Sequence, residues 1–163
     1  MPPRAPLEPG DSRELCGWAG HELGVSAWHE ITQETIDAFA AVTGDDYWLH
    51  TDPERAADSR YGTTIAHGLL TLSLAPTCTY ELISYRRFAA SVNYGLNRVR
   101  FPAPVPVDSQ VRMRATVAGV EELEGGAQLT LALVFERQGG SKPVCVAETV
   151  TRVFDREPGD RRE

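Results

Sequence analysis

The segment LLTLSLAPTCTYELISY, residues 69–85, constrains the fold of this chain more than any other part of the sequence. If the segment is helical, apolar side chains occupy nearly every side of it, which is the pattern of a helix buried around most of its circumference. Pro76 lies inside the segment, and because proline lacks an N–H and clashes with the preceding turn, it must kink or end the helix. The rest of the chain must therefore build a structure that covers this helix.

The second half of the chain has the period-two pattern of β-strands. Apolar and polar residues alternate from Val111 to Val117, and residues 128–135 and 143–154 are alternating and rich in β-branched side chains. A further strand is expected over 91–101. It should end there because the proline-rich run that follows cannot lie inside a sheet. Glycine pairs predict turns between strands, at 125–126 and 139–140. Helices followed by about four antiparallel strands predict an α+β fold, with a curved sheet wrapped around the buried helix.

A shorter helix is expected before the apolar one. Thr32 is a suitable N-cap, the residues after it carry an apolar stripe, and Gly44 is a suitable end. The polar and aromatic residues 45–68 follow, and within them Asp52 and Pro53 predict the cap and first position of another short helix.

The length of 163 residues fits one domain, which we expect to span residues 13–154. Residues 1–12 are rich in proline and polar residues, and residues 155–163 are charged, so both ends are expected to be loose. No apolar run is long enough to span a bilayer and the N-terminus lacks the apolar core of a secretory signal, so we expect a cytoplasmic protein with no membrane partner. The net charge of -7 argues against a nucleic-acid partner, because Lys and Arg supply most of the affinity for phosphates.

The cysteines predict buried thiols. Cys16, Cys78 and Cys145 are an odd number, lie far apart and form no C-x-x-C pair. We therefore expect no metal site and no disulfide framework.

Three blocks of sequence carry polar residues in the order of one known family. They are Gly44-Asp45 followed by His50, then Ala66-His67-Gly68, and then NYGLNRVRFPAPVPVDSQVR over residues 93–112. On these blocks the chain resembles the MaoC-like hydratases, the (R)-specific enoyl-CoA hydratase group of the hot-dog fold. The resemblance covers nearly the whole chain outside its ends. It implies a single hot-dog domain with a long central helix, an overhanging helical segment that carries the catalytic loop, and a homodimer with pockets near the interface.

The resemblance implies that Asp45 and His50 transfer protons and that the Gly68 amide binds the thioester oxygen. This assignment has a physical basis. Addition of water to an enoyl thioester requires a base for the water, a proton for the α-carbon and a donor for the charge that builds on the thioester oxygen. A helix that begins at a glycine offers free N–H groups and close approach to a carbonyl. No cofactor or metal is implied, and coenzyme A or phosphopantetheine enters as part of the substrate.

Further residues are candidates for substrate binding. Trp48, Tyr47 and Tyr61 flank the motif and are either the wall of an acyl tunnel or ordinary packing. His67 is expected to form a structural hydrogen bond beside the substrate. Asn93 and Asn97 are expected to precede a strand near the pocket, where they either position the catalytic loop or lie in a solvated turn.

Arginines raise two more alternatives. Arg60 stands where relatives commonly have a Pro-Phe-Gly-like stretch, and it is either a solvent-facing charge or a cation that binds a carboxylate. Arg98 and Arg100 are two residues apart on one strand face, so they form either a binding strip for the phosphates of coenzyme A or an acidic carrier protein, or ordinary surface charge.

The predicted function is reversible addition of water to a trans-2-enoyl thioester of coenzyme A or an acyl carrier protein, giving the 3-hydroxyacyl thioester. Michael addition of glycine or another amine is the first alternative, because the same Asp45, His50 and Gly68 would serve it and Arg60 would hold the carboxylate. A non-catalytic acyl-thioester binding module is the second, since fold alone does not prove turnover. A thioesterase is disfavoured because the motif set matches the hydratase layout.

Overall fold

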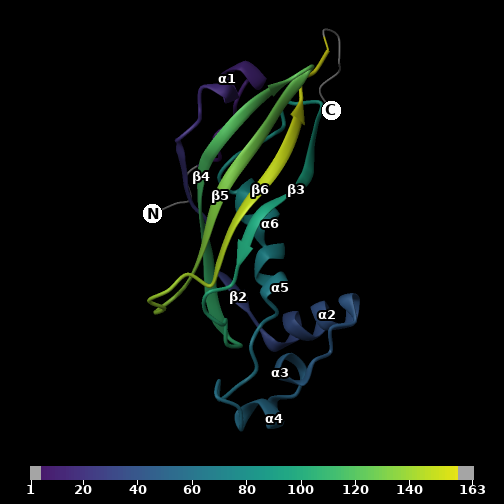
Figure 1. The fold of residues 1–163 in the computed structure, drawn as a ribbon, viewed down its shortest axis with the longest axis vertical. Coiled ribbons are helices and arrows are strands. Elements are labelled where there is room, and N and C mark those ends of the chain that lie inside the picture. The colour runs from purple at the N-terminus through teal and green to yellow at the C-terminus, as the bar shows by residue number, and fades with distance from the viewer. Residues whose placement is uncertain (1–4, 158–163) are drawn as a thin grey trace.

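The computed structural model describes residues 5–157 and forms one antiparallel sheet with short helices around it (Figure 1). The strands lie in the order β1-β4-β5-β6-β3, and β2 also pairs with β4. Along the chain the elements are α1 (Ser12–Cys16), β1 (Glu22–Val25), β2 (His29–Ile31), α2 (Gln33–Thr43), α3 (Trp48–Thr51), α4 (Pro53–Ala57), α5 (Gly68–Ser73), α6 (Ala75–Tyr80), β3 (Ala90–Arg100), β4 (Ser109–Leu123), β5 (Gly126–Arg137) and β6 (Cys145–Phe154). The predicted α+β class and the wrapped central helix are confirmed.

One face of the sheet forms the core. Alternate residues of β5 are fully buried, from Leu129 to Phe135, and so are alternate residues of β4, from Val111 to Val117. They pack with residues of α5 and α6 in a single apolar cluster, as the alternation in the sequence predicts. Burying each such side chain contributes about 1.5–3 kcal/mol, so this face provides most of the driving force for the fold.

The central helix is present as two consecutive short helices. Helix α5 ends at Ser73, and Pro76 occupies the opening turn of α6, so the predicted break at proline is confirmed. The helix stops at Tyr80 and does not continue to residue 85 as expected. The reason is a competing set of backbone bonds, because Leu7 donates to the carbonyl of Leu82 and accepts from the N–H of Ser84.

The overhanging segment consists of α2, α3 and α4, which lie at one end of the sheet, with α3 and α4 beyond it (Figure 1). The Thr32 hydroxyl accepts a bond from the N–H of Thr35, and Gly44 ends α2 in the left-handed conformation with φ of 78°. Asp52 caps α4 in the same way, with Pro53 in its first turn. These three predictions are confirmed, and together they fix where the loop between α2 and α4 begins and ends.

The chain ends that the structure describes make tertiary contacts. The N–H and hydroxyl of Ser12 both donate to the carboxylate of Asp155, at 2.9 and 2.5 Å. The predicted domain limits, 13–154, stay a prediction, and residues 1–4 and 158–163 of the predicted loose ends lie outside the described residues. Within residues 5–157 no helix has the length and apolarity needed to cross a membrane.

Candidate active site

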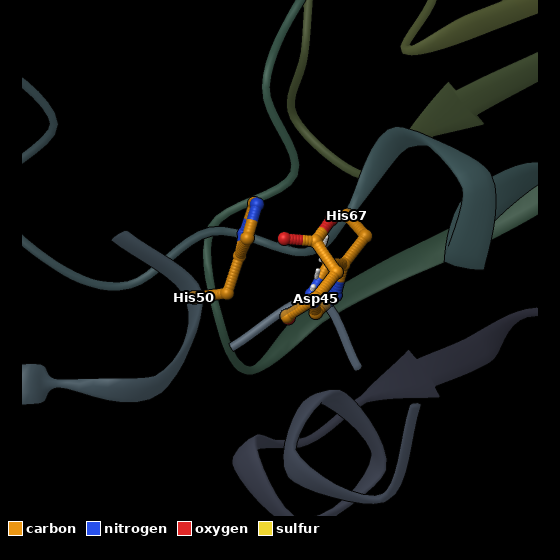
Figure 2. Close-up of side chains that lie close together, drawn as sticks. All are labelled: Asp45, His50 and His67. Atoms are coloured by element: carbon orange, nitrogen blue, oxygen red, sulfur yellow. Dashed lines mark hydrogen bonds and ion pairs between the residues drawn. The ribbon is translucent and has the colours of Figure 1, made fainter. Parts of the chain in front are cut away.

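Asp45, His50 and His67 meet at the junction of the overhanging segment and the central helix (Figure 2). Asp45 follows the end of α2, His50 lies in α3, and His67 immediately precedes α5. One side-chain nitrogen or oxygen atom from each residue lies within 4.8 Å of those of the other two. Three separate segments thus bring an acid and two imidazoles to one point.

The hydrogen bonds of His50 fix its tautomer. Its Nδ1 lies 2.7 Å from the carbonyl oxygen of Ile65. A carbonyl only accepts hydrogen bonds, so Nδ1 carries the hydrogen and donates it, and Nε2 of the neutral ring is a bare acceptor. The side chain is half-buried and lines a cavity, so Nε2 is suited to accept a proton from a small molecule.

His67 is buried, with 3% of its surface exposed. Its Nε2 donates to the main-chain carbonyl of Asp45 at 2.9 Å, and its ring stacks on that of His50 with centroids 3.8 Å apart. The ring of Phe39 packs near it at 5.1 Å. Because Nε2 carries the hydrogen, Nδ1 is an acceptor, and it is buried without a hydrogen-bond partner among the described residues. His67 therefore contacts both Asp45 and His50.

The carboxylate of Asp45 remains open to solvent, with its side chain 57% exposed. Figure 2 shows it pointing toward the His50 ring, and its Oδ2 lies 4.0 Å from Nε2 of His67. Since its main chain is held by His67 while its carboxylate is exposed, Asp45 presents a positioned acceptor to whatever enters beside His50.

A cavity of about 320 Å³ adjoins this cluster and includes Gly68. Its other lining residues include His50, Thr71 and the loop that follows β3. A Cβ atom on Gly68 would lie 2.8 Å from the ring of Phe101, so any side chain at this start of α5 would require the ring to shift. Helix geometry leaves the first N–H groups of α5 without partners inside the helix, and Gly68 is the first residue.

Arg60 and Tyr61 also line this cavity, as a substrate-binding role requires. The two side chains interact with each other, because the Arg60 guanidinium lies 4.7 Å from the centre of the Tyr61 ring and donates to its hydroxyl. The fixed cation is thus at the rim of the cavity and already has a partner.

Tyr47 and Trp48 are beside the cluster but outside the lining of this cavity. The Tyr47 ring meets the edge of His50 at 6.2 Å and is half-exposed, and Trp48 packs under the guanidinium of Arg55 at 4.4 Å. Their contacts in the structure are those of packing residues.

The candidates in residues 93–100 are not in the cluster. Asn93 and Asn97 lie within β3 and not before it, which corrects the predicted location. Asn97 donates to the carboxylate of Glu148, and Asn93 lines a second cavity, described below. Arg98 and Arg100 are exposed on β3, which is an edge strand.

The cluster is a poor match to a metal site. Nε2 of His67 carries a hydrogen that the Asp45 carbonyl accepts, and Nδ1 of His67 is buried, which leaves Nε2 of His50 and the Asp45 carboxylate as accessible metal ligands. Protein metal centres ordinarily use three or four ligands. The absence of a metal or cofactor stays a prediction.

A hot-dog fold with Asp and His beside the start of its central helix defines the class of this protein. Residues 17–135 match the family model described as MaoC like domain. The chain belongs to the MaoC-like family, as the motif blocks predicted.

Named relatives agree with this assignment. The chain is 48% identical over 140 residues to 3-hydroxyacyl-thioester dehydratase Z of Mycobacterium tuberculosis. The alignment covers 85% of this chain and 93% of that protein. It is 39% identical over 146 residues to Nodulation protein N of Rhizobium leguminosarum bv. viciae, covering 87% and 89%. Among solved structures, the (R)-hydratase from A. caviae involved in PHA biosynthesis superimposes with a TM-score of 0.65 at 26% identity, covering 82% of this chain and 94% of that one.

Proposed function

We propose that this chain is a hydro-lyase that interconverts 3-hydroxyacyl thioesters and trans-2-enoyl thioesters, with Asp45 and His50 as its acid/base pair. The observation that carries the proposal is the bare Nε2 of His50 beside the exposed Asp45 carboxylate, at a cavity that also reaches Gly68. The relatives named as a dehydratase and an (R)-hydratase support the same reaction.

In the hydration direction, His50 begins the reaction. Nε2 accepts a proton from water as the water oxygen bonds to the β-carbon, and the C=C electron pair moves toward the thioester carbonyl. The α-carbon then takes the proton from His50, which returns the ring to its starting state. Dehydration is the reverse, with loss of the α-proton and of the β-hydroxyl as water.

Asp45 and Gly68 stabilise the charges that this sequence creates. The Asp45 carboxylate accepts the second hydrogen of the water, which orients the attacking oxygen and stabilises the transient imidazolium. The Gly68 N–H donates to the thioester oxygen while it carries negative charge, and the positive end of the helix adds to this effect. Neither role requires a cofactor.

The alternatives receive less support. The relatives named above for a reaction are a dehydratase and a hydratase, so glycine addition gains nothing from them. Arg60, the residue expected to hold the glycine carboxylate, is paired with Tyr61. A non-catalytic module has no need for two imidazoles in fixed orientations beside an open carboxylate.

The substrate enters as an acyl thioester of coenzyme A or of a carrier protein. Arg98 and Arg100 on β3 provide positive charge close to the loop that lines the cavity, which suits the phosphates of either carrier.

A homodimer completes the sheet. Strand β3 is an edge strand with the exposed apolar residues Val92, Tyr94 and Leu96, and Leu96 lines a cavity together with Tyr80 of α6, which is also exposed. An exposed apolar edge of this kind is a template for pairing with another chain. A second copy that pairs through β3 would cover this edge.

The direct test is incubation of but-2-enoyl-CoA with the protein in oxygen-18 water, followed by mass analysis. Labelled 3-hydroxybutyryl-CoA is the expected product. Free coenzyme A without a hydroxyacyl product would replace the proposal by a thioesterase.

A further inference from the structure

A second cavity, of about 410 Å³, lies between the central helices and the edge of the sheet. Figure 1 shows α5 and α6 running alongside β3 and β6, and residues of all four elements line the cavity. On the helix side it is lined by Leu72, Ala75, Pro76 and Thr79. These positions are four, seven, eight and eleven residues after Gly68, so they continue along the same side of the helix.

The position of this cavity suits the acyl chain of the proposed substrate. Gly68 lies at the first cavity, and Thr79 is about 16 Å further along at the helical rise of 1.5 Å per residue. The sheet side shows the same progression. Val144, just before β6, lines the first cavity, and Thr149 and Thr151 of β6 line the second. Thr71 lines the first cavity and Leu72, the next residue of α5, lines the second, so the two cavities are neighbours along the helix and an acyl chain that begins at the Gly68 amide would point toward the second.

The wall of this cavity on the sheet side is mixed, with Leu96 and Leu131 beside several polar residues, where a plain alkyl site would be apolar throughout. Thr149 and Thr151 pair with Leu131 and Leu129 of β5, which are buried in the core, so the two threonines face the same side. The other residues of β6 on that side are Cys145, Ala147 and Val153. Asn93 of β3 pairs with Thr151 and lines the cavity beside it.

Tyr85, in the segment between α6 and β3, also lines the cavity. Its hydroxyl oxygen is buried and has no hydrogen-bond partner among the described residues, although Tyr85 lines this cavity. Burial raises the pKa of Tyr85 well above its usual range, so the hydroxyl stays neutral and both donates and accepts.

We propose that the second cavity binds the acyl chain and selects chains that carry an oxygen substituent, a hydroxyl or keto group, several carbons from the thioester. Thr149, Thr151 and Asn93 are the residues that recognise it. The proposal rests on the function proposed above, because it assumes that the thioester lies at Gly68. A plain alkyl chain would desolvate these groups without replacing their hydrogen bonds.

Binding of saturated acyl-CoA thioesters, measured by calorimetry on the full chain, tests this without any turnover. The probes are decanoyl-CoA and its isomers with a hydroxyl on the sixth, eighth or last carbon. One hydrogen bond predicts that at least one isomer binds about three- to tenfold more tightly than decanoyl-CoA. Equal affinity for decanoyl-CoA and every isomer would overturn the proposal and indicate that water alone satisfies these groups.

The double variant Thr149→Val/Thr151→Val removes the two hydroxyls while keeping β-branched side chains of similar shape. It should bind decanoyl-CoA more tightly than the wild type and the hydroxylated isomer less tightly, an inversion that misfolding cannot produce. Thr130→Val is the matched control, since Thr130 pairs with Val150 and faces the other side of the sheet. An unchanged preference in the double variant would also overturn the proposal, whereas failure of wild-type protein to hydrate but-2-enoyl-CoA would bear only on the proposed reaction.

Discussion

The imidazole rings of His50 and His67 stack with their centroids 3.8 Å apart and their planes 30° apart. His67 also donates to the main-chain carbonyl of Asp45. One buried ring therefore holds both members of the proposed acid/base pair, one through its face and one through its Nε2–H. The Ala-His-Gly motif marked this residue in the sequence, but only the structure reveals its two contacts.

His67→Phe separates these contacts, because phenylalanine keeps a stacking ring and loses the bond to Asp45. We expect kcat to fall roughly ten- to a hundredfold, since small displacements of catalytic groups have effects of that size, while KM changes little. Steady-state kinetics with a short enoyl thioester measures this. If kcat/KM fell by the same factor only because KM rose, His67 would serve substrate binding and would not position Asp45.

Gly68→Ala tests the approach of the thioester to the start of α5. The added Cβ would lie 2.8 Å from the Phe101 ring, so we expect a stability loss of about 1–3 kcal/mol together with a large fall in kcat. Urea unfolding and kinetics measure the two effects.

A second substitution, Phe101→Leu in the Gly68→Ala chain, separates the two causes. It should restore stability and leave activity low, because the methyl group still occupies the place of the carbonyl. Recovery of activity along with stability would remove the oxyanion role of Gly68.

Leu96→Lys tests the proposed dimer. Leu96 is 48% exposed on the edge strand β3, and a charge there opposes pairing of two copies. Light scattering should find a dimer for the wild type and a monomer for the variant. Val42→Lys, the same kind of change at an exposed apolar position in α2, should leave the dimer intact; a dimer in both variants would place the interface elsewhere.

The thiols give a prediction about burial and pH. Cys78 and Cys145 are buried, and burial raises the pKa of both, that of Cys145 from 9.0 to about 11. Iodoacetamide at mildly alkaline pH should therefore alkylate Cys16 alone in the folded protein and all three cysteines after unfolding, as counted by mass. Rapid alkylation of Cys145 without unfolding would contradict its position in the core.

The same shift sets the sign of a pH effect on stability. The folded state holds the Cys145 proton more tightly than the unfolded state. The stabilisation of the folded state by the neutral Cys145 thiol is therefore intact below the unfolded pKa of 9.0 and is lost as the pH rises through about 11. Cys145→Ala should reduce the fall in unfolding free energy over this range. An identical fall in the variant would assign the effect to other groups.

Local signals in the sequence predicted most elements of the fold. Thr32 and Gly44 bound α2 as expected, and Pro76 broke the central helix, because caps and proline act through the backbone within one turn. Strands β1 and β2 gave no usable signal, since four and three residues are too few to display a period.

The site was predictable in part for a different reason. Asp45, His50 and His67 lie within one continuous stretch of the chain, so the spacing of the motifs predicts that they belong to one site. For Trp48 the sequence leaves open a tunnel wall or ordinary packing, and for Asn93 a role in positioning the catalytic loop or a solvated turn. Their side-chain contacts depend on the Arg55 that covers Trp48 and on which strand forms the sheet edge. Such contacts between elements are set by tertiary packing and leave no local signal.

Asp45 and His50 are proposed to catalyse hydration together. The decisive measurement is the rate at which the variants Asp45→Asn and His50→Gln form 3-hydroxybutyryl-CoA from but-2-enoyl-CoA. Both variants keep the size and much of the polarity of the original side chains, and circular dichroism and unfolding curves establish that they are folded. We expect kcat/KM to fall roughly a hundredfold or more for each, through loss of the general acid/base group in His50→Gln and of the carboxylate that orients the water and stabilises the imidazolium in Asp45→Asn. Full activity in either variant would contradict the proposed pair.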